Sequence, residues 1–239
     1  MKKILVFALA LVLLVGAAEA QKKNTNKKTS RVTSSSATQD KNNDGTVTAP
    51  NTIMLPVSYH GLDASLHQAM KHRESIRQLS SEDIPEDILS SLLWATYGYN
   101  RPDQKKRVAP SAVNAQEFDI YVFTRDGIYI YDAEKNSLNP VAEGDHRSEI
   151  SEQKHFVEAP ISIVLVANFD RMKRFGSVED RNFYAAVDCG YISQNIYLYC
   201  SAAELGTVAC GAINRDLLHK LLGIKNGRAM IAHPIGHKM

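Results

Sequence analysis

Residues 182–205 read NFYAAVDCGYISQNIYLYCSAAEL, a long stretch with apolar side chains at helical spacing. This spacing predicts one long helix with a buried face, and Gly206 directly after it is a typical C-terminal stop. A second apolar run, ISIVLVA at residues 161–167, is continuous and rich in β-branched residues. Such a run predicts a central strand buried on both faces. Together the two stretches indicate a sheet with a long helix packed on it.

Shorter patterns on either side predict further elements. The Arg125-Asp126-Gly127 stretch separates two apolar runs and is typical of a hairpin turn. No internal repeat is present. The fold class is therefore α+β, a central mixed sheet packed by helices. The expected helices cover 62–72, Ser80 or Ser81 to Gly98, and 214–222; the expected strands cover 118–123, 128–131, 207–210 and 228–233.

The first 20 residues have the three regions of a secretory signal peptide. Lys2 and Lys3 precede an apolar run at 4–15, and small residues at 18–20 form a cleavage site. The run is shorter than the roughly 20 residues that span a bilayer, so no membrane anchor is expected after cleavage. We expect an exported protein, periplasmic or secreted, whose mature chain starts near Gln21.

Composition divides the rest of the chain into two parts. Residues 21–50 are rich in Lys, Asn, Thr and Ser and carry six basic and two acidic residues, which predicts a disordered polar tether. Residues 51–239 hold 20 Lys or Arg against 23 Asp or Glu, so the predicted domain is mildly acidic. This charge argues against a nucleic-acid partner.

Several classes of site lack their sequence signatures. Neither Gly-x-Ser-x-Gly nor His-Glu-x-x-His occurs, which argues against the common hydrolases. The histidines and cysteines show no metal-ligand spacing, so no metal is expected. Three cysteines cannot all pair, and we interpret Cys189, Cys200 and Cys210 as buried thiols, with any redox role left open.

Two polar motifs suit a phosphorylated heterocycle. Residues 73–77 read Arg-Glu-Ser-Ile-Arg, and two arginines around a serine offer forked donors and a hydroxyl to one phosphate. Residues 110–116 read PSAVNAQ, whose hydroxyl and amide groups suit the edge of a heterocycle. The alternative interpretations are a solvated arginine face and a polar loop that caps a strand.

Two further motifs lie near the C-terminus. Residues 205–211 read LGTVACG, in which two glycines bracket a short strand and permit a close approach of its backbone. Residues 234–238 read PIGHK, interpreted as a turn that leaves Lys238 near the end of the chain.

In this order and spacing the four motifs resemble the nitroreductase-like family of FMN enzymes. Residues 92–98 are similar to the family's second helix, and 188–198 to its long central helix. Residues 127–132, with Leu138, resemble the branch that contains the azoline oxidases of peptide maturation. The resemblance implies a homodimeric oxidoreductase that transfers two electrons through bound FMN in a ping-pong cycle, using a small-molecule substrate and an electron donor.

The resemblance also implies roles for individual residues, but it assigns no catalytic side chain. Residues around the phosphate and ribityl chain would be Arg73, Ser75 and Arg77, with Lys238 adding charge. The backbone at Ala209, Cys210 and Gly211 would face the flavin, one amide donating to N5. Residues reaching the flavin from the partner subunit would be Ser111, Asn114 and Gln116.

Two other functions remain open from the sequence. A non-catalytic module of the same fold would hold a flavin or another ligand without turnover. A lyase-like or ring-fragmenting flavin reaction is the other. Nicotinamide cofactors are not expected outside the cytoplasm, so an exported enzyme would need another reductant or would pass electrons to oxygen.

Overall fold

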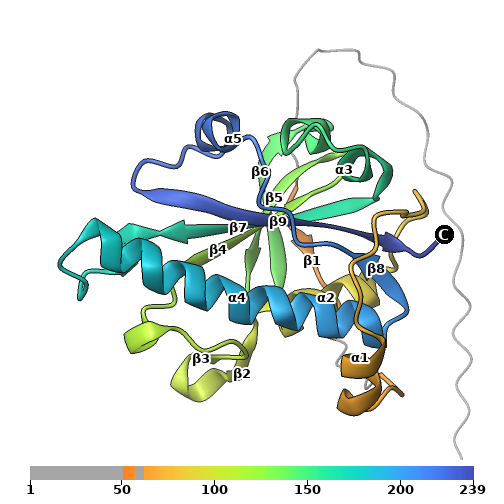
Figure 1. Cartoon of the computed structure of the whole chain (residues 1–239), viewed down its shortest axis with the longest axis horizontal. Helices are drawn as coiled ribbons and strands as arrows, with labels where there is room; N and C mark the ends of the chain where they lie inside the picture. The colour runs from red at the N-terminus through yellow and green to blue at the C-terminus, as the bar shows by residue number, and fades with distance from the viewer. Residues whose placement is uncertain (1–50, 58–61) are drawn as a thin grey trace, which may run out of the picture. The chain divides into compact units, whose positions relative to one another are not determined.

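A seven-stranded sheet in the order β1-β6-β5-β4-β7-β9-β8 forms the centre of the domain (Figure 1). The structure, a computed structural model, describes residues 51–57 and 62–239. The predicted signal peptide and tether at 1–50 lie outside the described residues. The strands are β1 (Ile53–Met54), β4 (Phe118–Phe123), β5 (Gly127–Asp132), β6 (Ser137–Glu143), β7 (Ile161–Asn168), β8 (Leu205–Thr207) and β9 (Gly227–His237).

Helices cover both faces of this sheet, which confirms the α+β fold predicted from the sequence. The long helix α4 and helix α2 pack on one face, while α3 and α5 pack on the other. A small hairpin of β2 (Tyr99–Arg101) and β3 (Lys106–Arg107) follows α2, and short 3-10 turns cover 102–104, 112–114, 147–149 and 169–171. The helices are α1 (Leu66–His72), α2 (Glu86–Tyr97), α3 (His155–Glu158), α4 (Val178–Ala202) and α5 (Arg215–Leu221).

The strand directions differ from the mixed sheet that was expected. Every pair of neighbouring strands in the described sheet is antiparallel. Strands β7 and β8, which α4 connects, run parallel to each other, as expected for two strands joined by a crossover helix. They are not neighbours, however, because β9 lies between them and is antiparallel to both.

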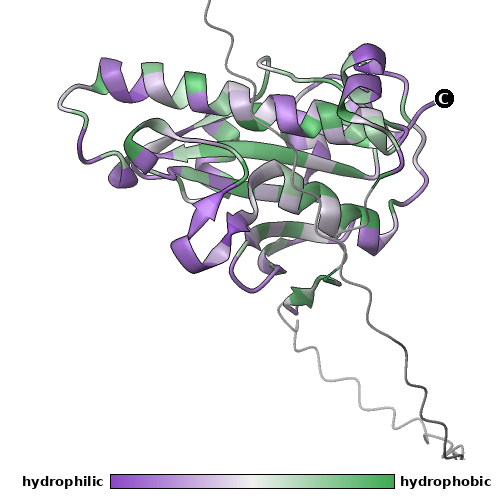
Figure 2. Cartoon of the chain, turned by 90° about the horizontal axis from the view of Figure 1, so that it is seen from below, coloured by the Kyte–Doolittle hydropathy of each residue, from purple (hydrophilic) through white to green (hydrophobic). Residues whose placement is uncertain are grey.

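Strand β7 is the buried central strand predicted from the apolar run at 161–167. Ile161, Ile163 and Leu165 face the core beneath α2 and α4, whereas Val164 and Val166 face the core beneath α3 and α5. Because side chains alternate along a strand, a continuous apolar run serves both cores at once. Figure 2 shows apolar residues concentrated along the inner strands of the sheet.

Helix α4 is longer at its start and shorter at its end than 182–205. It begins after Ser177, whose Oγ accepts from the Asp180 N–H at 2.9 Å, as a helix cap does. It ends at Ala202, and Glu204 then turns the chain with a positive φ of 58°. The prediction that Gly206 stops the helix is therefore wrong. No helix among the described residues has the length and apolarity needed to cross a membrane.

Helix α2 begins at Glu86 rather than at Ser80 or Ser81, so that predicted boundary is wrong. Pro85 disfavours helical geometry at the residue before it, and the helix therefore starts after the proline. Helix α1 likewise starts at Leu66, where Ser65 and the Gln68 side chain form a capping box.

The C-terminal segment 234–238 was interpreted as a turn, and this interpretation is also wrong. Strand β9 continues to His237 because it pairs with β7 on one side and with β8 on the other. The strand predicted at 207–210 is shifted to Leu205–Thr207, and Cys210 makes only an isolated bridge to Ala232. Pairing on both sides thus outweighs the local preference for a turn at Pro234.

Candidate functional site

The extended segment between α1 and α2 runs along the edge strand β8 and ends beside the C-terminus. The Ile76 N–H donates to the Thr207 carbonyl at 2.9 Å, and Leu79 forms a bridge with Lys238. Gly206 permits this approach, since a Cβ there would lie 2.6 Å from Leu79 Cδ2. The fold therefore brings the motif at 73–77 beside two motifs that lie more than 100 residues further along the chain, those at 205–211 and 234–238.

Tyr197 of α4 joins these motifs through its hydroxyl. The Tyr197 Oη lies 2.9 Å from Ser75 Oγ and accepts from the Ala209 N–H at 2.8 Å. Arg73 places its guanidinium carbon 5.3 Å from the centre of the Tyr197 ring, within the range of a cation–π contact. Sequence reasoning missed this tyrosine, because its helical spacing resembles that of any core residue.

Cys210, in the segment that follows β8, contacts His155 of α3. The Cys210 Sγ lies 3.5 Å from His155 Nε2, and both side chains are buried. Burial raises the pKa of the Cys210 thiol, although the nearby Arg77 opposes the shift. Burial and the charge of Arg77 both lower the pKa of His155. The pair is therefore a neutral imidazole against a protonated thiol at neutral pH.

His233 of β9 lies behind the site, in a hydrogen-bond chain that runs from Ser193 through His233 and Thr207 to the Pro234 carbonyl. Thr207 Oγ1 donates to the Pro234 carbonyl at 2.9 Å and accepts from His233 Nδ1 at 3.1 Å. His233 Nε2 therefore accepts from Ser193 Oγ at 2.9 Å. Complete burial lowers the pKa of His233 to about 3, so the imidazole is neutral and its tautomer is fixed.

The backbone at 209–211 leaves one amide open. The Ala209 N–H donates to Tyr197 and the Cys210 N–H to the Ala232 carbonyl at 2.8 Å. Among the described residues no acceptor takes the N–H of Gly211, which is exposed. A Cβ built on Gly211 would meet no atom within 4 Å, so space is open beside it.

The loop at 110–116 lies on a different part of the domain. The Ala112 N–H donates to Asp188 Oδ2 of α4 at 2.8 Å. Asp188 and Tyr197 are nine residues apart, which is about two and a half helical turns. The helix therefore presents them on opposite sides. The structure does not bring Ser111, Asn114 and Gln116 to the arginine motif within one chain.

The backbone of this loop is strained. Val113, Asn114 and Gln116 have positive φ values of 49°, 56° and 50°, which is rare for residues with a Cβ and most costly for a β-branched one. Hydrogen bonds hold the shape, since Ser111 Oγ accepts from the Gln116 N–H at 3.0 Å. Strain of this kind persists only where the surroundings determine the conformation.

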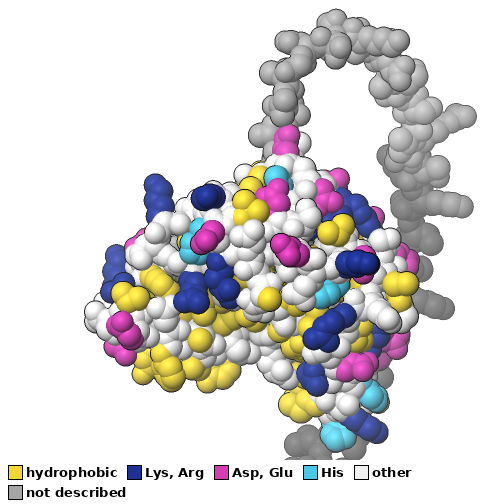
Figure 3. Space-filling view, turned by 45° about the horizontal axis from the view of Figure 1, so that its top comes forward, with side chains coloured by type: hydrophobic (Ala, Val, Ile, Leu, Met, Phe, Trp, Pro, Cys, Tyr) yellow, Lys and Arg dark blue, Asp and Glu magenta, His cyan; other side chains and the backbone are white. Residues whose placement is uncertain are grey.

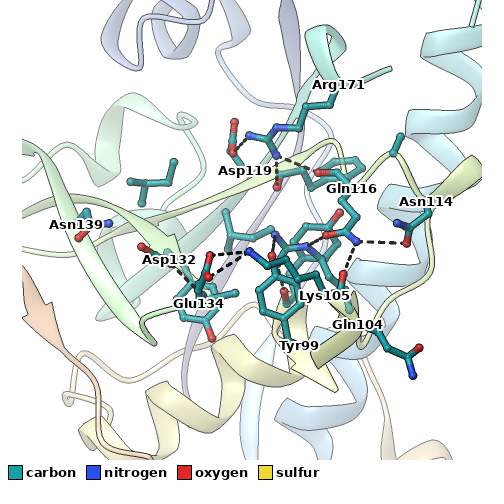
Figure 4. A pocket seen from close by; sticks show the side chains of 18 residues that line it. Tyr99, Gln104, Lys105, Asn114, Gln116, Asp119, Asp132, Glu134, Asn139 and Arg171 are labelled. Carbon is teal, nitrogen blue, oxygen red and sulfur yellow. Dashed lines mark hydrogen bonds and ion pairs between the residues drawn. The ribbon is translucent and has the colours of Figure 1, made fainter. Parts of the chain in front are cut away.

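The side chain of Gln116 points into a cavity of about 640 Å³ between the β2–β3 hairpin and the sheet (Figure 4). Its amide accepts from Arg107 Nε at 2.9 Å and donates to the Lys105 carbonyl at 2.7 Å. The cations that line the cavity are engaged as well: Lys105 pairs with Glu134, Arg171 pairs with Asp119, and Arg107 lies over the rings of Tyr97 and Tyr99.

Two carboxyl groups lie together beneath this loop. Glu117, just before β4, is fully buried, and the Asp188 carboxyl is its neighbour. Burial raises the pKa of Glu117 to about 7, and the charge of the nearby Asp188 adds to the shift. Neither carboxyl oxygen of Glu117 has a hydrogen-bond partner among the described residues. Burial also raises the pKa of Asp188. Two adjacent buried carboxyls cannot both ionise readily, so they share a proton near neutral pH.

The residues around Ser75 fit an FMN phosphate. Arg73 and Arg77 supply two cations, Ser75 an exposed hydroxyl and Lys238 an exposed ammonium. Gly211 adds an open amide and free space for a flat ring. The carboxylate of Glu74, also exposed, is the one acidic side chain within the motif.

Comparisons with known proteins agree with this geometry. A sequence profile of the Nitroreductase family matches residues 70–237. A protein of Methanocaldococcus jannaschii, provisionally named a nitroreductase, is 29% identical over 188 residues, 74% of this chain and 93% of the relative. A crystal structure from Ralstonia eutropha JMP134, also provisionally named a nitroreductase, is 31% identical with a TM-score of 0.73, covering 79% of this chain and 90% of that one.

A more distant structure shares the fold. The microcin synthetase complex of Escherichia coli includes a chain that is 14% identical with a TM-score of 0.59, over 77% of this chain and 76% of that one. At this identity the likeness is one of fold alone. The family profile, by contrast, spans well over half of the sequence and includes the motifs at 73–77 and 205–211. This chain belongs to the nitroreductase family.

Proposed function

We propose that this chain is an exported, homodimeric oxidoreductase that uses FMN for two-electron transfer. Family membership makes it an oxidoreductase. The observation that supports the cofactor is that the segment with Arg73, Ser75 and Arg77 lies along β8, and that Tyr197 links Ser75 to Ala209, two residues before the open Gly211 amide. A phosphate at the arginines and a flavin ring at Gly211 would use both ends of this site.

The side chains and backbone amides of this chain would bind the cofactor and orient it. Arg73 and Arg77 hold a phosphate by charge-assisted hydrogen bonds, and Lys238 adds charge nearby. The Gly211 N–H is the amide that is free to donate to N5 of the ring, whereas those of Ala209 and Cys210 are engaged within the chain. Bound FMN would supply the two-electron chemistry, with donor and acceptor using one open face in turn.

The absorption spectrum of the purified protein tests the cofactor, and steady-state turnover tests the enzyme. We expect flavin bands in the visible region of the spectrum. We also expect turnover of an electron acceptor when dithionite or another non-nicotinamide compound is the electron donor. A tightly bound flavin that is reduced but never passes its electrons on would favour the non-catalytic binding module.

A homodimer is supported by the opposite placement of the two motifs on α4. Asp188 holds the loop that contains Ser111, Asn114 and Gln116, while Tyr197 contacts Ser75 on the other side of the helix. A second copy is needed for the loop to reach a flavin bound at the arginines, and the loop would then supply polar groups from the partner subunit.

The outer face of α4 offers an apolar contact surface for that second copy. Phe183, Val187 and Tyr191 recur every four residues and are 63%, 38% and 48% exposed. Figure 3 shows hydrophobic side chains gathered at the lower left, on the side where α4 begins in Figure 1. An apolar stripe of this spacing on a long helix is typical of helix–helix packing.

Replacing Val187 by lysine is expected to convert the dimer into monomers, because the charge would be buried in the interface. Flavin should be released at the same time, since each site would lose its partner loop. Light scattering and flavin fluorescence measure the two effects. Val157→Lys, at an equally apolar exposed position on α3, is the control. A wild-type monomer that retains stoichiometric FMN would contradict the proposal.

Export is proposed from the sequence of residues 1–20. The mature chain is expected to begin at Gln21 when the full-length protein is produced in a bacterium with a secretion system. N-terminal sequencing of the protein from the periplasm or medium checks this, and finding Met1 there would contradict a cleaved signal.

A further inference from the structure

Tyr197 is the one side chain of α4 that touches two segments of the proposed FMN site. Its hydroxyl lies 2.9 Å from Ser75 Oγ and 2.8 Å from the Ala209 nitrogen. Its ring lies under the Arg73 guanidinium at 5.3 Å and meets the His233 ring edge-on at 5.3 Å. The neutral, fully buried His233 holds the ring from behind, so the phenol is fixed in direction.

The direction of the hydrogen bonds follows from their chemistry. A backbone N–H can only donate, so Tyr197 Oη is the acceptor toward Ala209. The phenol then has its own proton to give, and the only other polar partner described for it is Ser75 Oγ. Ser75 accepts this proton and keeps its own for donation outward. The chain Ala209, Tyr197, Ser75 thus ends in a hydroxyl that donates toward solvent.

We propose that Tyr197 is a positioning residue that sets the Ser75 hydroxyl as a donor toward the phosphate of the cofactor. This inference rests on the proposed function, because it requires a phosphate between Arg73 and Arg77. A phosphate dianion offers only acceptors, so a serine fixed as a donor suits it, and hydrogen bonds to a charged group are the stronger kind. Ser75 is exposed and lies between the two arginines.

The hydroxyl and the ring of Tyr197 have separate roles. Phenylalanine keeps the ring face under Arg73 and the edge contact to His233, but removes the oxygen that links Ala209 to Ser75. Tyr199, two residues further on, directs its hydroxyl to the Ile88 carbonyl of α2 at 3.3 Å. Tyr199→Phe is therefore a matched control that removes a phenol oxygen from the same helix away from the site.

The test is a double-mutant cycle with Tyr197→Phe, Ser75→Ala and the double variant, titrating apoprotein with FMN and riboflavin by flavin fluorescence. We expect Tyr197→Phe to weaken FMN binding about tenfold and to leave riboflavin, which has no phosphate, within about twofold. In the Ser75→Ala background the same change should cost nothing further for FMN. Tyr199→Phe should leave both ligands unchanged.

Three results would overturn the inference. Equal losses for FMN and riboflavin, or a full loss that persists without Ser75, would mean that Tyr197 only supports the fold. A folded wild type that binds no FMN would remove the proposed function itself. If Tyr197→Phe does not fold, hydrogen exchange of the wild-type protein is the second test. The Ala209 amide should stay protected from exchange with and without FMN. Loss of this protection when FMN binds would contradict the proposed hydrogen-bond chain from Ala209 through Tyr197 to Ser75.

Discussion

Replacing Arg73 by alanine is expected to weaken FMN binding ten- to a hundredfold. Each hydrogen bond to a charged phosphate contributes roughly 1.5–3 kcal/mol, and about 1.4 kcal/mol is a tenfold change in affinity. Arg77→Ala should have a similar effect, because Arg77 is the second cation of the same motif and its charge acts on Cys210 in the 205–211 segment, where it opposes the rise in the thiol pKa caused by burial. Fluorescence titration of apoprotein measures both variants.

Riboflavin separates phosphate binding from a general effect on the fold. It should bind the wild type poorly and lose little more affinity in Arg73→Ala, because it has no group for the arginine to hold. Arg174→Ala, an exposed arginine before α4, is the matched control and should leave FMN affinity unchanged. Equal losses of FMN and riboflavin in Arg73→Ala would mean that the arginine supports the structure without touching the phosphate.

The sequence predicts most of the elements whose signals are local. The Asp126-Gly127 turn is confirmed between β4 and β5, and the apolar run at 161–167 is confirmed as β7. The failures come where pairing across the sheet decides. Pro234 suggested a turn, but it lies in a strand with partners on both sides. Gly206 suggested a helix stop, but its small size serves a contact with Leu79.

In the candidate site, too, residues with a local sequence signal could be predicted and residues that depend on distant contacts could not. The motif at 73–77 has a recognisable chemistry of its own, and the fold places it beside 205–211. Tyr197, His155 and Glu117 carry no such signal. Each acquires its role only from a residue more than ten positions away in the chain: Ala209 for Tyr197, Cys210 for His155 and Asp188 for Glu117.

The raised pKa of Glu117 predicts that stability falls as the pH rises from about 4.5 to about 7. The unfolded chain releases the Glu117 proton near pH 4.5, whereas the folded chain keeps it to about pH 7. Between these values the folded state binds more protons, so its free energy of unfolding decreases with pH. A shift of this size corresponds to about 3 kcal/mol, or roughly 6–12 °C in thermal midpoint for a domain of this length.

Glu117→Gln tests this, because glutamine is close to glutamate in size and is neutral at every pH. The thermal midpoint of the wild type, relative to that of Glu117→Gln, should drop between pH 5 and pH 8, and the exposed Glu152→Gln should follow the wild type. If plots of the thermal midpoint against pH are parallel for the wild type and Glu117→Gln, no proton is held at Glu117 near neutral pH.

Asp188 also connects this proton to the strained loop. Once the pair carries two negative charges, repulsion would press the Asp188 carboxylate away from Glu117, while Arg171 and Arg107 are already engaged elsewhere. The Ala112 N–H, held at 2.8 Å by Asp188 Oδ2, should therefore exchange faster above pH 7 than its intrinsic rate increase explains. In Glu117→Gln this excess should disappear, since the amide side chain keeps a neutral partner beside Asp188 and the loop keeps its anchor.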